Sequence, residues 1–124
     1  FRRVLFRSSK QLLSGSSQGK GIKVAATSST GTTIHATGTS SSIQDELWLW
    51  CVNSSTSAVK LTIQYGGTTS PDNDIEVTVP GESGLMTVIP GLPITGTGAA
   101  ATTVYAFAGT ANVLVIYGFV NRIT

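Results

Sequence analysis

Short runs of alternating apolar and polar residues follow one another from Asp45 to Val120, and each run ends in a cluster of Gly, Pro, Asn, Ser or Thr. Two shorter runs precede them, and no helical pattern interrupts the series. Regularly spaced short strands separated by turn residues are typical of antiparallel sandwiches and barrels. We therefore predict an all-β fold, a single antiparallel β-sandwich of about eight strands that is jelly-roll-like. The expected strands are Gly21–Thr27, Thr32–Ala36, Asp45–Val52, Val59–Tyr65, Ile75–Val79, Leu85–Ile89, Thr103–Ala108 and Val113–Val120.

The first 18 residues differ in composition from everything after them. They carry the basic string FRRVLFRS and then a stretch rich in Ser and Gly that is typical of a linker. One interpretation is a basic arm that reaches a neighbouring molecule. The lack of an initiator Met and the similarity of FRRVLFRS to translated adapter sequence favour a flexible or non-native segment at residues 1–18. We expect one domain, the β-sandwich, over residues 19–124, since 124 residues suffice for one two-layer core.

Charge is scarce in this chain and unevenly distributed. Only 11% of the residues are charged, against about 25% in a typical soluble domain. After residue 23 the chain has two basic and six acidic side chains, so the net charge of this part is 2 − 6 = −4. An acidic domain lacks the clustered Lys and Arg of a nucleic-acid-binding surface, so we expect no nucleic-acid partner. A neutral surface rich in hydroxyl groups favours a protein that packs against other subunits.

Membrane and disulfide signals are also weak. No apolar run reaches the roughly 18 to 20 residues of a membrane-spanning helix, and residues 1–13 are too interrupted by Arg and Ser for a signal peptide. The single cysteine, Cys51, cannot form an intramolecular disulfide. We expect no membrane partner and synthesis in the cytoplasm.

The strongest predicted strand is Asp45–Val52, with the sequence DELWLWCV. Its two-residue period puts an apolar set of side chains on each face. We therefore predict a central strand, covered by the second sheet on one face and by a loop or a neighbouring subunit on the other. The first face holds Leu47, Leu49 and Cys51, and the second holds Trp48, Trp50 and Val52.

The two tryptophans raise the main question of binding. Trp48 and Trp50 could belong to the core, form a subunit or partner interface, or provide a stacking platform for sugar rings, since aromatic residues are enriched in cores and interfaces alike. We favour core or interface over a glycan site. The other aromatic residues considered for such a platform are Tyr65, Tyr105, Phe107 and Tyr117.

Two local expectations concern solvent exposure and turn geometry. Strand Val59–Tyr65 alternates in polarity, so its polar residues Lys60, Thr62 and Gln64 are expected on a solvated face. Pro80–Gly81 has the order of a type II turn, in which Gly81 would take a positive φ.

Residues able to do chemistry are few and scattered. His35 is isolated, and we expect it to be partly buried or at an interface; Cys51 is expected to act as a small apolar core residue. Asp45 and Glu46 point to opposite faces, which is poor geometry for an acid/base pair, and they are expected to mark the solvated start of a strand. No phosphate-binding glycine loop or nucleophile elbow is present. We predict no enzyme activity, no catalytic residues and no cofactor.

A metal site is considered only in one loop. Asp72, Asn73 and Asp74 offer oxygen atoms that could bind Ca²⁺, which takes 6 to 8 oxygen ligands. No matching acidic cluster or EF-hand spacing accompanies them. We favour a turn stabilised by Asp and Asn side chains, and predict no metal.

Three long segments resemble small virion proteins of tailed phages. The resemblance covers about residues 30–124, and its most specific parts are LTIQYGGTTSPDNDIEVTVP at 61–80 and ANVLVIYGFVNRI at 111–123. The N-terminal segment lies outside it. The segments are DELWLWCVNSSTSAVKLTIQYGGTTSPDNDIEVTVP, GLMTVIPGLPI and VYAFAGTANVLVIYGFVNRIT.

The resemblance implies a phage structural protein located in the virion. It implies a head decoration or cement protein that binds the major capsid protein of the assembled head and stabilises it. A homo-oligomer is expected, with a trimer as first choice because capsid lattices offer threefold sites. The alternative is a glycan- or host-surface-binding module of a phage fibre or tail.

Overall fold

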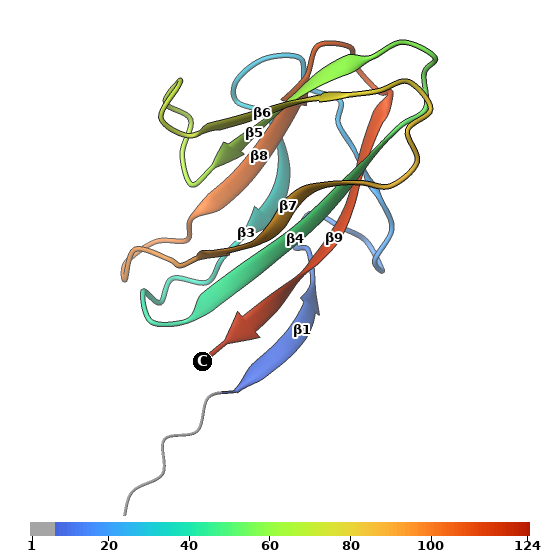
Figure 1. Ribbon diagram of the computed structural model, residues 1–124. Helices are drawn as coiled ribbons and strands as arrows, with labels where there is room; N and C mark the ends of the chain where they lie inside the picture. Colours follow the sequence, from blue (N-terminus) through green and yellow to red (C-terminus); the bar gives the residue numbers. More distant parts are fainter. Residues whose placement is uncertain (1–6) are drawn as a thin grey trace, which may run out of the picture.

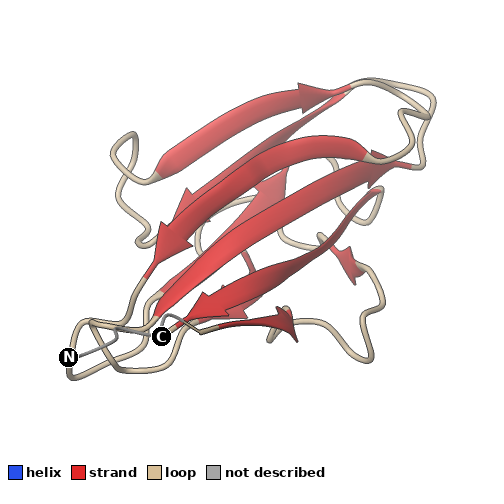
Figure 2. Ribbon diagram, turned by 60° about the horizontal axis from the view of Figure 1, so that its bottom comes forward, coloured by secondary structure: helices blue, strands red, loops and turns tan. Residues whose placement is uncertain are grey.

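The computed structural model of the protein describes residues 7–124, which form two packed antiparallel β-sheets without a helix (Figures 1 and 2). None of these residues therefore belongs to a helix that could cross a membrane. The nine strands are β1 (Ser8–Leu12), β2 (Ile22–Lys23), β3 (Thr32–Ala36), β4 (Gln44–Asn53), β5 (Val59–Tyr65), β6 (Asp74–Val79), β7 (Met86–Ile94), β8 (Thr103–Ala108) and β9 (Leu114–Ile123).

The pairing of the strands is that of a jelly roll. One sheet has the order β1-β9-β4-β7, with β2 also paired to β9, and the other has the order β3-β8-β5-β6. Strands β1 and β2 both run antiparallel to β9, so they act as one edge strand interrupted by residues 13–21. Counted this way, eight strands form a long antiparallel hairpin that wraps into two four-membered sheets, which confirms the predicted sandwich.

The core lies between the two sheets and follows the predicted alternation. In β4, Leu47, Leu49 and Cys51 point inward and are fully buried, while Trp48, Trp50 and Val52 point outward. Inward residues of β5, β8 and β9 meet them from the other strands. They include Leu61, Ile63, Val104, Ala106, Leu114, Ile116 and Val120. Strands β3, β5 and β8 have the bounds expected from the sequence.

The folded part begins earlier than the expected boundary at residue 19. Strand β1 pairs with β9 over Phe119–Ile123, and the side chain of Leu13 is buried in the core. Gly15 packs so closely on β3 that a Cβ there would lie 2.5 Å from the carbonyl oxygen of Thr33. The sequence of β1, SSKQL, shows no alternation of apolar and polar residues, and most of its side chains are exposed. Backbone pairing with β9, rather than burial of side chains, holds this strand in place. Of the predicted segment at 1–18, residues 1–6 lie outside the described residues.

Two local predictions were wrong. Lys60 is exposed as expected, but Thr62 and Gln64 are buried. The Gln64 side chain accepts a hydrogen bond from the Gly31 amide and donates one to the Ser29 hydroxyl. Gly81 does not take a positive φ; Glu82 does, at 53°. Gly81 is required for another reason, since a Cβ there would lie 2.3 Å from the carbonyl oxygen of Thr56.

Candidate functional site

The outward surface of the five-stranded sheet carries the largest group of neighbouring aromatic side chains. Trp48 of β4 lies directly opposite Phe119 of β9 in the strand register. Their ring centroids are 6.3 Å apart at an interplanar angle of 12°, and the Trp50 ring lies 5.9 Å from the same Phe119 ring at 28°. The three side chains are half-buried and form one continuous aromatic group.

Side chains from β1 and β9 extend this group toward the edge of the sheet. The Lys10 ammonium lies over the Phe119 ring, 4.6 Å from its centroid, in a cation–π arrangement. Leu12 is 56% exposed and Tyr117 is 39% exposed, so both add apolar surface beside the aromatic group. We call this surface the aromatic face; it comprises Lys10, Leu12, Trp48, Trp50, Tyr117 and Phe119.

Polar groups lie at one end of the aromatic face. The Glu46 carboxylate accepts a hydrogen bond from the Trp48 indole nitrogen at 2.8 Å and a second one from the Asn121 amide at 3.2 Å. These two bonds, the Trp48 one foremost, lower the pKa of Glu46. On the β7 side, a Cβ at Gly91 would come within 2.8 Å of the Trp48 ring. The orientation of Trp48 is therefore set from both sides.

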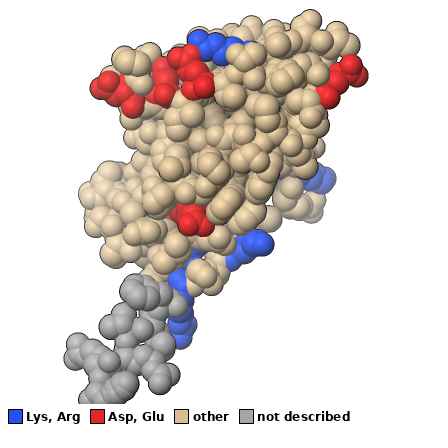
Figure 3. Space-filling model, in the orientation of Figure 1, with Lys and Arg blue, Asp and Glu red and all other residues tan. Residues whose placement is uncertain are grey.

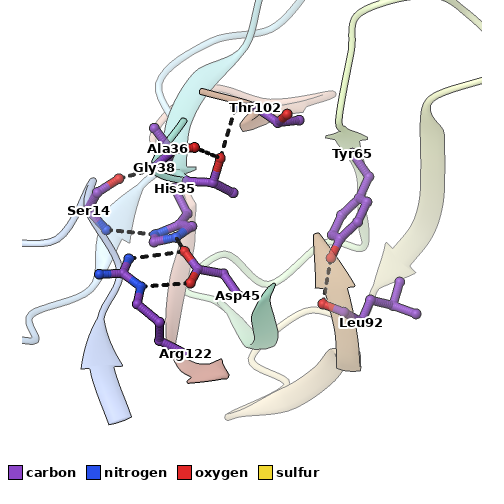
Figure 4. A network of polar contacts seen from close by, with 10 residues as sticks. Ser14, His35, Ala36, Gly38, Asp45, Tyr65, Leu92, Thr102 and Arg122 are labelled. Atoms are coloured by element: carbon purple, nitrogen blue, oxygen red, sulfur yellow. Dashed lines mark hydrogen bonds and ion pairs between the residues drawn. The ribbon is translucent and has the colours of Figure 1, made fainter. Parts of the chain in front are cut away.

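A second group of polar residues surrounds Asp45, on the inward face near the start of β4, and is shown in Figure 4. Asp45 is 1% exposed and receives two bonds from Arg122 of β9, at 2.8 Å from Nε and 3.1 Å from Nη2. The His35 Nε2 atom lies 2.7 Å from the same carboxylate. Burial alone would raise the pKa of Asp45, but the bonds from Arg122 and His35 outweigh burial and hold this pKa below its ordinary value.

The hydrogen bonds assign the state of the His35 ring. The backbone N–H of Ser14 donates to Nδ1 at 3.0 Å, so Nδ1 is an acceptor and the proton sits on Nε2, which donates to Asp45. The Ser14 hydroxyl accepts a bond from the Ala36 amide at 2.7 Å. None of the hydrogen bonds among residues 7–124 joins this hydroxyl to the imidazole, as a nucleophilic serine would require. The group ties the N-terminal segment to β3, β4 and β9.

This arrangement changes the interpretation of the acidic pair in β4. Asp45 and Glu46 do point to opposite faces, as predicted. The expectation that both mark a solvated strand entrance was wrong for Asp45, which is buried in an ion pair. Tyr65 also reflects this buried environment, because burial and, less strongly, the Asp45 charge raise its pKa, and its hydroxyl donates to the Leu92 carbonyl.

The remaining candidate residues are placed as follows. Cys51 lies in the core, where burial raises the pKa of its thiol to about 11. Asn73 organises a turn: its side-chain oxygen accepts a hydrogen bond from the backbone N–H of Thr69, and its own backbone N–H donates to the Thr69 carbonyl. Within the part of the chain that the structure describes, no three His, Cys, Asp or Glu side chains come together as a metal site would require. Gly38, Thr39, Ser40, Ile43 and Arg122 line a shallow pocket of about 240 Å³.

Comparison of the chain with protein-family models gives no match, and a search of curated proteins gives none either. The fold and the side-chain geometry therefore carry the functional argument. Sequence reasoning identified Trp48 and Trp50 but missed Phe119, which joins them. The alternation of β9 would place Phe119 on an outward face, but only the register between β4 and β9 brings it between the two tryptophans.

Proposed function

We propose that this protein is a structural component of a phage particle, a head decoration protein that binds the major capsid protein through its aromatic face. The observation that carries this proposal is the outward, half-buried position of Trp48, Trp50 and Phe119 on the five-stranded sheet. Neither tryptophan belongs to the core between the sheets. This position is compatible with a subunit or partner interface and with a glycan site. Exposed apolar groups rimmed by polar residues are typical of interaction sites, and aromatic residues are enriched in protein interfaces.

The two sheets differ in a way that supports this choice of surface. The outer side of the four-stranded sheet is closed in part by the loop around Ser29 and Gly31, which holds Gln64. On the aromatic face, the segment around Gly19 and Gly21 packs against Leu12 and Tyr117 at the edge, and Trp48, Trp50 and Phe119 stay half-buried. Jelly rolls occur in viral capsid proteins and in lectins, so the fold is compatible with the phage proposal and with its alternative, but does not choose between them.

Capsid stabilisation also fits the composition of the chain. A decoration protein acts by burying surface at many equivalent positions, and weak contacts become strong when a homo-oligomer engages several of them at once. Such contacts need no cofactor. The hydroxyl-rich loops can supply water-mediated hydrogen bonds around the aromatic centre. A trimer remains the first choice, because it can match the threefold positions of a capsid lattice.

The direct test is co-sedimentation of the purified chain with expanded empty heads of its phage that lack this protein. The proposal predicts saturable binding, with a fixed number of copies per head and an increase in the temperature at which the heads disrupt. Unexpanded heads serve as the control for binding to the assembled, mature surface. Failure to bind expanded heads at micromolar concentration would contradict the proposal.

A glycan-binding module of a fibre or tail is the second candidate, and one observation favours it. Glu46 and Asn121 lie at the end of the aromatic face beside the Trp48 ring. A carboxylate and an amide next to an aromatic ring can bind sugar hydroxyls while the ring stacks on the sugar. Titration of the chain with a panel of oligosaccharides, followed by tryptophan fluorescence, tests this function. A saturable change that Glu46→Gln weakens, together with no binding to heads, would favour the glycan-binding module.

A further inference from the structure

Two of the four edge strands of the sandwich are closed to further strand pairing. Strand β7 contains Pro90 and Pro93, which lack the N–H that a ladder needs. Strand β3 has an irregular register and is covered by the N-terminal segment: the Gly15 amide donates to the Ile34 carbonyl, and the Ala36 amide donates to the Ser14 hydroxyl. Prolines, bulges and covering loops are the usual means of protecting sheet edges.

The other two edges, β1 and β6, are open. Among the described residues, β1 pairs only with β9 and β6 pairs only with β5. Neither strand contains a proline. They lie on opposite sides of the molecule: β1 borders the five-stranded sheet far from β7, and β6 borders the four-stranded sheet far from β3 (Figure 1). An open edge presents unpaired backbone groups that can pair with another chain.

The two open edges carry opposite charge. Lys10 of β1, Lys23 of β2 and Lys20, which lies just before β2, give one side basic character. Asp72 and Asp74, with Glu76 of β6, make the other side acidic, and only Lys60 opposes them there through its ion pair with Glu76. Figure 3 shows the acidic cluster at one end and basic side chains toward the other. The chain has eight basic side chains, two of which precede residue 7, so residues 7–124 contain 8 − 2 = 6 basic side chains and six acidic ones. Their net charge is zero, but the two signs lie at different edges.

We propose that copies of this protein associate head to tail, with the basic β1 edge of one copy bound to the acidic β6 edge of the next. Such a contact joins two different surfaces, so it forms a ring if the rotation closes and an open chain if it does not. Opposite charges fix which edges meet, because like edges would repel. This contact would engage Lys10 at the β1 margin of the aromatic face and leave Trp48 and Trp50 of every copy free for another partner.

The proposal specifies the contact between copies that the proposed function calls for, but it is tested separately. In a ring, each copy presents its aromatic face at the same angle to the symmetry axis, so all copies can engage one lattice together. A monomeric wild-type chain that binds heads would refute the head-to-tail contact and leave the decoration function intact. A chain that associates through these edges but does not bind heads would support the head-to-tail contact and contradict the decoration function.

The experiment reverses the charge of one edge at a time in the full chain. Lys20→Glu/Lys23→Glu makes the basic edge acidic, and Asp72→Lys/Glu76→Lys makes the acidic edge basic; all four positions are exposed. Thr110→Glu, in the exposed β8–β9 turn, is the control for added charge elsewhere. Light scattering and analytical ultracentrifugation give the mass, and circular dichroism verifies that each variant is folded.

Each reversal alone should shift the chain toward monomer, with self-association weakened about tenfold or more because like charges now meet. An equimolar mixture of the two reversed chains should associate again, since every contact between unlike chains joins opposite charges. The Thr110→Glu control should keep the wild-type mass. The proposal is overturned by a monomeric wild-type chain, by folded reversed variants that keep the wild-type mass, or by a mixture that fails to associate.

Discussion

The two faces of strand β4 carry comparable apolar side chains and make different contributions to the molecule. The inner face holds Leu47, Leu49 and Cys51, all with no exposed surface, and Asp45 in a buried ion pair. The outer face holds Trp48 and Trp50, which are half-buried and contact Phe119. Residue size and hydrophobicity alone would assign both faces to the core. Their burial assigns the inner face to stability and leaves the outer face available for binding.

The largest expected effect comes from breaking the buried ion pair on the inner face. Asp45→Ala removes the partner of Arg122 and His35 and leaves the imidazole of His35 buried without its acceptor. We expect a loss of about 3 to 5 kcal/mol in the free energy of unfolding, measured by urea denaturation. Glu46→Ala, the neighbouring carboxylate on the outer face, is the matched control and should change stability little. Equal effects of the two substitutions would contradict the contrast between the faces.

A cavity on the inner face should be nearly as costly. Leu49→Ala removes a fully buried side chain, and we expect a loss of about 2 to 5 kcal/mol. The denaturation midpoint should fall while the dependence of free energy on urea concentration stays constant. A loss below about 0.5 kcal/mol, the size expected of an ordinary surface substitution, would mean that the two sheets pack loosely at this point.

The Asp45 carboxylate also predicts how stability depends on pH. Its folded-state pKa is lowered, so it binds fewer protons in the folded state than in the unfolded state, and its contribution is present above the unfolded pKa of about 4. This contribution is lost as the pH falls through the lower, folded value. The stability difference between wild type and Asp45→Asn should therefore shrink as the pH decreases below about 4. A difference that is constant from neutral to acidic pH would contradict this assignment.

The smallest effect on stability is expected on the outer face. Trp48→Ala removes a larger side chain than Leu49→Ala, but the tryptophan is only half-buried, where it stacks on Phe119 and donates to Glu46. We expect a loss of about 1 to 2 kcal/mol, well below the roughly 3 to 5 kcal/mol of a buried aromatic residue. Thermal denaturation can rank the two variants. A Trp48→Ala chain less stable than Leu49→Ala would place Trp48 in the core after all.

The contrast also shows how far sequence reasoning extends. Alternation and turn residues predicted strands β3, β5 and β8 with correct bounds, and assigned the two faces of β4 correctly. Three features depended on contacts between distant residues. Strand β1 is defined by its partner β9, Gln64 is buried by the loop around Gly31, and Asp45 is buried because Arg122, 77 residues away, pairs with it. The local pattern of apolar and polar residues does not indicate which distant residues will pair in the folded chain.

The central claim is that the outer face of β4 binds a partner, and one binding measurement tests it most directly. The affinity for expanded heads is compared between wild type, Trp48→Ala/Trp50→Ala, and a control, Tyr105→Ala/Phe107→Ala, which alters half-buried aromatic residues of β8 in the other sheet. The account predicts that the tryptophan variant remains folded and loses head binding, while the β8 control retains it. A folded tryptophan variant that binds heads as tightly as the wild type would contradict the account.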